Sequence, residues 1–237
     1  MTTLVLDLKG NVSRKVAKLK EMRKQRGVTL LEIIIVLGII GVIAAGVVIL
    51  AQRAFTAQDL SDIQNNSNSI RTAMVEAFKD EGSYPTATGT IKGLTKSTIA
   101  ASTEDTPIVT LVKLGKISPE ESFNGISNDA FQIDHAITDT SSSLFKGFVL
   151  VVNGLEQEEC RNLISTMGNQ WDYVEALATN APAGTLVASV GNRNLSAPAT
   201  SPVLKTLISG DIPASAIVAK GVCEQTGANN GVIFGSK

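Results

Sequence analysis

The chain has 237 residues, one histidine, two cysteines and a formal net charge of −1. Residues 1–27 carry eight lysines or arginines against two acidic residues, a net of +6, so the remainder carries −7. An acidic remainder excludes nucleic acid as the expected partner, because neutralising phosphates requires lysine and arginine.

A basic leader and an apolar run open the chain. Residues 1–27 lack an apolar periodicity, and Ile33–Ala51 is apolar for about 28 Å of helix, which is enough to cross a bilayer. The basic flank predicts that the amino terminus lies in the cytoplasm and that residues from about 52 onward lie outside. A cleaved secretory signal ending at 44–46 is the alternative, but the apolar run continues to Leu50, too far for such a signal.

A helix is predicted from about residue 29 to residue 80. Thr29 and Glu32 have the spacing of a capping box, and an acidic first turn suits the helix dipole. Gly82 and Pro85 are typical stop signals. Spacings of three and four predict one buried stripe along the second half of this helix: Leu60, Ile63, Ser67, Ile70, Met74 and Ala77.

Glu32 is the lone carboxylate at the start of the apolar run. An ionisable group at the edge of a membrane span is costly and usually functional. We therefore expect Glu32 to hold subunits in register within a filament. Gly38, Gly41 and Gly46 have two interpretations: close packing between helices, or a weak point that bends or melts when the helix leaves lipid.

Residues 83–146 are rich in threonine, serine and glycine and are predicted to form a long surface loop against the long helix. A short helix is expected at about 106–114, where Pro107 suits the first helical position. His135 falls in this loop beside Asp134. The two could form an acid–base pair, but a solvated pair in a polar loop is the favoured interpretation.

From residue 147 the pattern changes to short apolar runs. Helices are expected at Glu156–Met167 and Pro202–Ile208. Strands are expected at Gly147–Val152, Trp171–Leu177, Thr185–Val190, Ala216–Lys220 and Val232–Phe234. Short connections suit a mostly antiparallel sheet laid on the amphipathic half of the long helix, so the predicted fold class is α+β. About 155 residues follow the long helix, enough for one domain.

The sequence contains no pattern typical of an active site. It has no Gly-x-Ser-x-Gly elbow, phosphate-binding loop or dinucleotide fingerprint, and one histidine with two cysteines cannot build a metal-ligand cluster. Trp171 and Tyr173 fit strand packing better than a ligand platform. The acidic run 156–159 fits a solvated helix start. We therefore expect no catalysis, no metal and no cofactor.

Cys160 and Cys223 both fall in the part expected to be exported. An oxidising compartment and an even cysteine count favour a disulfide between them. A disulfide between them would close a loop of about 62 residues and would stabilise the fold by roughly 4 kcal/mol. The alternative is a pair of unbonded, buried thiols.

The residues from Gly27 to Gly41, preceded by a basic leader, resemble a type IV prepilin. The long leader, the stretch Ala45–Ala54 and the segment from Gly154 to Cys160 resemble the type IVb group of the toxin-coregulated, enterotoxigenic colonisation-factor and longus pili. The resemblance implies the type IV pilin fold: a long amino-terminal helix on a mostly antiparallel sheet, with a long loop between them and a disulfide-bounded carboxyl-terminal region.

The resemblance also implies how the chain is divided and processed. A prepilin peptidase would cleave after Gly27 and methylate the new amino group of Val28, and Glu32 would neutralise the amino-terminal amine of a neighbouring subunit. The expected parts are a leader that is removed (1–27), the hydrophobic half of the long helix (28–55) and a globular headgroup (56–237). Within the headgroup, the loop region is 83–146 and the sheet and disulfide region is 147–237.

The implied function is that of the major structural subunit of a type IVb pilus, which forms extracellular filaments for adhesion, self-aggregation and colonisation. Expected partners are further copies of the chain, the prepilin peptidase, the inner-membrane assembly machinery and a minor pilin. The subunit would wait in the bacterial inner membrane before it joins the pilus. One alternative is a minor pilin or secretion pseudopilin, and another is an anchored binding protein that needs neither cleavage at Gly27 nor a carboxylate at Glu32.

Overall fold

A computed structural model of the chain describes residues 29–237, which fall into two units with the boundary between Arg53 and Ala54. Helix α2 (Leu30–Phe78) begins in the first unit and ends in the second. The short 3-10 helix η1 (Lys79–Glu81) follows it, and Gly82 ends the helical region in the left-handed conformation, with φ of 73°. The long amino-terminal helix is therefore confirmed.

The second half of α2 buries a narrow stripe of side chains, as its spacing predicts. Ile63, Ile70 and Met74 are fully buried, and Ala77 is partly buried against the same cluster. The buried residues of the helix are Leu60, Ile63, Ser67, Ile70, Ala73, Met74 and Phe78. Each lies three or four positions from the next along most of the stripe, so one face of this half of α2 packs on the core.

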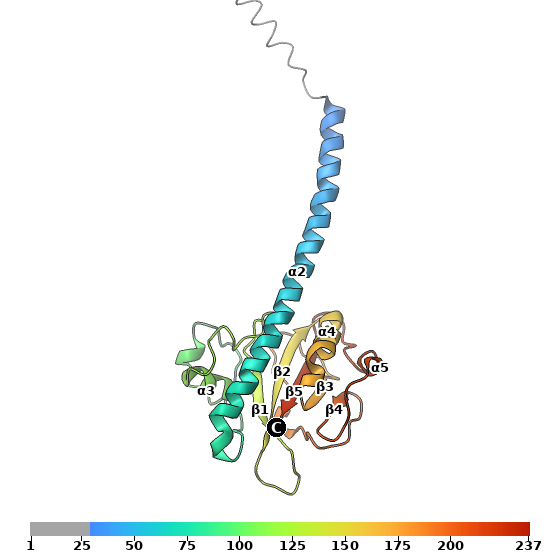
Figure 1. The fold of residues 1–237 in the computed structure, drawn as a ribbon. Coiled ribbons are helices and arrows are strands. Elements are labelled where there is room, and N and C mark those ends of the chain that lie inside the picture. Colours follow the sequence, from blue (N-terminus) through green and yellow to red (C-terminus); the bar gives the residue numbers. More distant parts are fainter. Residues whose placement is uncertain (1–28) are drawn as a thin grey trace, which may run out of the picture. The chain divides into compact units, whose positions relative to one another are not determined.

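A five-stranded sheet forms the centre of the second unit (Figure 1). Its order is β1-β2-β5-β3-β4, and every neighbouring pair is antiparallel, which confirms the predicted sheet. The strands are β1 (Gln132–Ala136), β2 (Gly147–Leu155), β3 (Tyr173–Ala176), β4 (Val203–Lys205) and β5 (Asn230–Ser236).

Both faces of the sheet are covered. Along β2, Phe148, Leu150 and Val152 join a core cluster with the stripe of α2, whereas Val149 and Val151 join a second cluster on the opposite face. That second cluster is closed by residues of the irregular segment after β3: Leu177, Ala181, Val190 and Leu195. Because it is covered on both sides, β2 is buried along its whole length and reads as a continuous apolar run.

The remaining helices are short. Pro107 begins α3, as predicted, and α4 follows the capping residue Glu156. Their bounds, with those of the last helix and the 3-10 helices, are α3 (Pro107–Lys113), α4 (Gln157–Met167), α5 (Ala214–Ile217), η2 (Ile99–Ala101), η3 (Gly168–Gln170) and η4 (Val190–Asn192). Cys160, Leu163, Ile164 and Met167 form the buried face of α4, which the sequence predicts.

The prediction of a surface loop over 83–146 is wrong in two respects. Gln132–Ala136 forms β1 at the edge of the sheet, paired with β2. Ile99, Ile108 and Leu111 are fully buried in the main core cluster. Polar residues dominate the segment because they make turns and side-chain bonds there, and the few apolar residues between them enter the core.

Three further elements differ from the prediction. Pro202–Ile208 contains the short strand β4 (Val203–Lys205) and no helix, because Val203 and Lys205 pair with β3. Ala214–Ile217 is a helix where a strand beginning at 216 is expected, and Thr185–Val190 is irregular. In β4, pairing with the neighbouring strand outweighs the local preference of a short segment.

Strand β2 also continues beyond its predicted end at Val152. The pairing with β5 shifts register between Val152 and Leu155, which accommodates Asn153 and Gly154 as an irregularity within the strand. Gly154 has φ of 73°, a conformation that favours glycine. The Asn-Gly pair therefore marks a bulge here and not a turn.

Candidate functional site

Glu32 lies in the first turn of α2 and is exposed. Its backbone N–H donates to Thr29 Oγ1 at 3.3 Å, and the N–H of Ile33 donates to the Thr29 carbonyl oxygen at 3.2 Å. Thr29 therefore caps the helix through one of the two hydrogen bonds of the predicted capping box. The carboxylate lies at the positive end of the helix dipole, where its charge is stabilised.

The apolar part of α2 is uncovered in the single chain. Every residue of 30–50 is exposed, and even Ile33 and Val36 leave 47% of their surface open. Soluble monomers rarely expose a continuous apolar surface of this extent. Within the described part of the chain, this is the one helix long and apolar enough to cross a membrane by length and composition. It therefore requires cover from lipid or from other protein.

No contact among the described residues explains why three positions in this segment are glycine. A Cβ added to Gly38, Gly41 or Gly46 would meet no atom within 4 Å among the described residues. Glycine costs about 1 kcal/mol relative to alanine inside a helix. A requirement for small residues here must therefore come from something outside the subunit.

The predicted cleavage site cannot be placed in the fold. Gly27 and Val28 lie outside the described residues, which begin at Thr29. The predictions of cleavage after Gly27 and of methylation at Val28 thus remain predictions from sequence.

The structure contains the disulfide between Cys160 and Cys223. Both residues are fully buried, and their Cα atoms lie 5.9 Å apart. The bond ties α4 to the segment that follows α5. Cys223 has φ of 51°, which is uncommon for a residue with a side chain.

Arg71 carries a network that sequence reasoning missed. Its Nε donates to Ser236 Oγ at 2.9 Å, and its Nη1 donates to the carbonyl oxygen of Gln170 at 2.6 Å. Nη2 lies 3.7 Å from Asp172 Oδ2, and the guanidinium lies 5.2 Å from the centre of the Trp171 ring. Arg71 thereby joins α2 to β5 and to the start of β3. Its place on the polar side of the helix gave no signal for this role.

A second polar network closes the far side of the sheet. Arg193 donates from Nε to Glu175 Oε2 at 2.9 Å and from Nη2 to Oε1 at 3.1 Å, and the Tyr173 hydroxyl donates to Oε2 at 2.8 Å. Burial raises the pKa of Tyr173, and the Glu175 carboxylate raises it further, so the phenol stays protonated. Tyr173 is thus engaged within the fold and does not form an open platform.

His135 and Asp134 are built into the fold and not solvated in a loop, which corrects the prediction. His135 Nδ1 lies 2.8 Å from Asp134 Oδ1, and the same oxygen accepts the backbone N–H groups of Ala87 and His135. The imidazole packs on the Phe145 ring with centres 3.7 Å apart. The pair therefore ties β1 to the backbone at Ala87 and to the side chain of Phe145.

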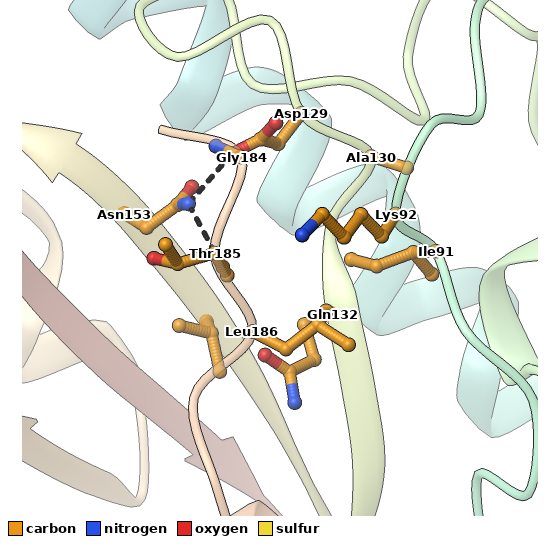
Figure 2. Close-up of a pocket in the computed structure, with 10 residues that line it drawn as sticks. Ile91, Lys92, Asp129, Ala130, Gln132, Asn153, Gly184, Thr185 and Leu186 are labelled. Carbon is orange, nitrogen blue, oxygen red and sulfur yellow. Dashed lines mark hydrogen bonds between the residues drawn. The ribbon is translucent and has the colours of Figure 1, made fainter. Parts of the chain in front are cut away.

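Several residues that line a pocket beside β1 and β2 are hydrogen-bonded to one another (Figure 2). Asn153 Nδ2 and the backbone N–H of Gly184 each donate to Asp129 Oδ2 at 2.7 Å. Asp129, Asn153 and Gly184 of this pocket are thus bonded to one another. Among residues 29–237, no three histidine, cysteine or acidic side chains are placed to hold a metal ion.

Comparisons with known proteins agree with the geometry of α2. The family model for the prokaryotic N-terminal methylation motif matches residues 22–48. The chain is 38% identical to a toxin coregulated pilin of Vibrio cholerae over 162 residues, which are 67% of this chain but only 65% of that protein. It is 35% identical to the toxin coregulated pilin of Vibrio cholerae serotype O1 (strain ATCC 39315 / El Tor Inaba N16961), over 71% of each chain.

A solved structure shares the fold. The crystal structure of TcpA, a type IV pilin from the Vibrio cholerae El Tor biotype, matches with a TM-score of 0.57 and 23% identity, over 76% of this chain and 99% of that one. At this identity the match establishes the fold: a long amino-terminal helix on an antiparallel sheet. Together with the relative that is 35% identical over 71% of each chain, it shows that the chain belongs to the type IV pilin family.

Proposed function

We propose that the chain is the major structural subunit of a type IVb pilus and that it polymerises through the apolar first part of α2. The observation that supports this most strongly is the continuous exposed apolar surface of residues 30–50, with one carboxylate at its start. A soluble domain has no use for such a segment. A subunit that must leave a membrane and enter a fibre requires it.

The exchange from lipid to fibre is physically easy for this segment. Lipid would cover the apolar surface before assembly, and the same segments of other copies would cover it afterwards, so the free energy changes little between two apolar environments. The small residues Gly38, Gly41 and Gly46 would allow close approach of neighbouring helices. A head-to-tail contact that does not close on itself generates a helical filament.

Glu32 would set the axial register of the filament. Removal of residues 1–27 would create an amino group at Val28, and a carboxylate and an ammonium attract strongly in a surrounding of low dielectric constant. Each is costly when it is buried without its partner. A subunit out of register would leave both charges unpaired, so the pair favours one alignment.

Processing, location and use follow from the same proposal. A prepilin peptidase would remove the leader and methylate Val28, a step that the match to the N-terminal methylation motif supports. The precursor would lie in the inner membrane with its amino terminus inside, and the assembly machinery would draw it into an extracellular pilus. The filament would serve adhesion, self-aggregation and colonisation, with no catalysis by the chain.

Replacing Glu32 tests the proposal. Glu32→Gln keeps the size of the side chain and removes its charge, so the processed subunit should fold and remain in the membrane but yield no filaments. Electron microscopy and immunoblotting of sheared surface material measure the yield. Glu81→Gln, an exposed carboxylate in η1, is the matched control and should leave filaments normal. Normal filament numbers in Glu32→Gln would refute the role in register.

A further inference from the structure

A cavity of about 210 Å³ opens where α2 ends, between the last turn of the helix and the segments around Tyr84 and Phe145. All of its lining residues belong to the second unit. None of residues 30–50 lines this cavity, and no role described above uses it.

The aromatic floor of this cavity is formed in advance. The Tyr84 ring packs on Phe148 with centres 5.0 Å apart and meets Phe78 edge-on at 6.5 Å. The N–H of Tyr84 donates to the carbonyl oxygen of Phe145 at 2.7 Å, and the N–H of Phe145 donates to Ser83 Oγ at 3.0 Å. These two bonds clamp the walls together, so a ligand would find the rings already in place.

Tyr84 offers a polar group within this aromatic surface. The residue is partly exposed and lines the cavity. Burial raises the pKa of Tyr84, so the phenol stays protonated and remains able to donate a hydrogen bond.

Two lysines contribute to the lining of the cavity. Lys79 and Lys146 both line the cavity and are exposed, and neither forms an ion pair within the described part of the chain. Lys116, by contrast, pairs with a glutamate at 3.3 Å. Asp80 and Glu81 follow Lys79 in the chain but do not line the cavity. The mouth therefore carries positive charge without an internal counterion, which favours an anionic ligand.

We propose that this cavity binds an anionic sugar, with its ring against Tyr84 and Phe145 and its carboxylate or phosphate between Lys79 and Lys146. The aromatic rings match the apolar C–H face of a pyranose, and a small inorganic anion would leave them unused. A neutral sugar would leave both lysines unused. This inference goes beyond filament formation and does not depend on it.

Saturation-transfer NMR on the detergent-solubilised full-length chain tests the inference. The probes are N-acetylneuraminic acid, which carries a carboxylate, glucose 6-phosphate, and the neutral sugar N-acetylmannosamine. We expect transfer to at least one anionic probe, none to the neutral one, and weaker binding as the salt concentration rises. Binding of one anionic probe alone identifies the carboxylate or the phosphate as the preferred group, and binding of both supports the shared chemistry.

Lysine variants connect the signal to this cavity. Lys79→Gln and Lys146→Gln should each weaken binding about threefold, and the double variant about tenfold. Lys113→Gln, an exposed lysine of α3 outside the cavity, should bind as the unaltered chain does. Equal transfer to the neutral sugar, no transfer to either anionic probe, or unchanged affinity in the double variant would overturn the proposal.

Discussion

Arg71 leaves the polar side of α2 and reaches the carboxyl end of the chain, where it meets Ser236, the carbonyl oxygen of Gln170 and the carboxylate of Asp172. Asp172 also accepts the N–H of Lys237, so the last residues are held to the helix through one cation and one carboxylate. A contact between residues 165 positions apart leaves no mark in a sequence. Sequence patterns report local periodicity and cannot pair two polar residues at this separation.

Arg71→Leu should lower the free energy of unfolding by about 2 kcal/mol, because it removes charged hydrogen bonds and leaves their acceptors without a donor. Thermal or denaturant unfolding of the full-length chain in detergent measures the loss. Lys92→Gln, at an exposed position outside the network, is the control and should leave stability unchanged. An Arg71→Leu variant as stable as the original chain would show that the network contributes nothing to the fold.

The pKa of Glu159 links the electrostatics of one side chain to the pH dependence of stability. Burial raises its pKa, the negative charges of Glu156, Asp59 and Glu158 raise it further, and a hydrogen bond from the Glu156 N–H opposes them. The folded chain therefore binds more protons than the unfolded chain between the ordinary glutamate pKa and the raised value. The free energy of unfolding consequently falls as pH rises through this window.

Glu159→Gln should flatten that pH dependence and raise stability by about 0.3 kcal/mol at neutral pH, because it removes a repelling charge. Glutamine still accepts the backbone N–H of Glu156 and preserves the capping box. Melting temperatures measured from about pH 4 to 7 test this, with the exposed Glu120→Gln as the control. An unchanged slope in the Glu159 variant would contradict the assignment.

The elements that sequence could predict are those with strong local patterns. α2 and α4 have clear helical stripes, α3 begins at a proline, and β2 and β5 are apolar runs with turn signals beside them. β1 and β4 could not be predicted, because Gln132–Ala136 is mostly polar and Val203–Lys205 has three residues. Such edge strands owe their form to the neighbouring strand more than to their own composition.

The disulfide between Cys160 and Cys223 connects α4 to the segment that follows α5. Cys160→Ser should lower the free energy of unfolding by roughly 4 kcal/mol, because the unfolded chain is no longer closed into a long loop. Denaturant unfolding of the oxidised chain, the reduced chain and the variant tests this, and the last two should agree. Equal stability in all three, together with titratable thiols in the unreduced chain, would contradict a structural bond.

At the scale of the whole molecule, the two units meet different physical requirements. Residues 54–237 bury a core on both faces of a sheet and need no partner to cover it. Residues 30–50 leave their apolar surface open. Hydropathy alone predicts this contrast, since it reports where apolar residues stand in the chain. The sequence also predicts a functional role for the Glu32 carboxylate. The amine with which it would pair in a filament would belong to another copy of the chain.

The proposed function requires that the apolar helix is released from its leader and enters extracellular fibres. Mass spectrometry of the protein in sheared surface filaments tests this directly. We expect an abundant subunit that begins at Val28, carries a methyl group on its amine and lacks residues 1–27. A protein intact from Met1, found in the membrane and absent from surface filaments, would contradict it.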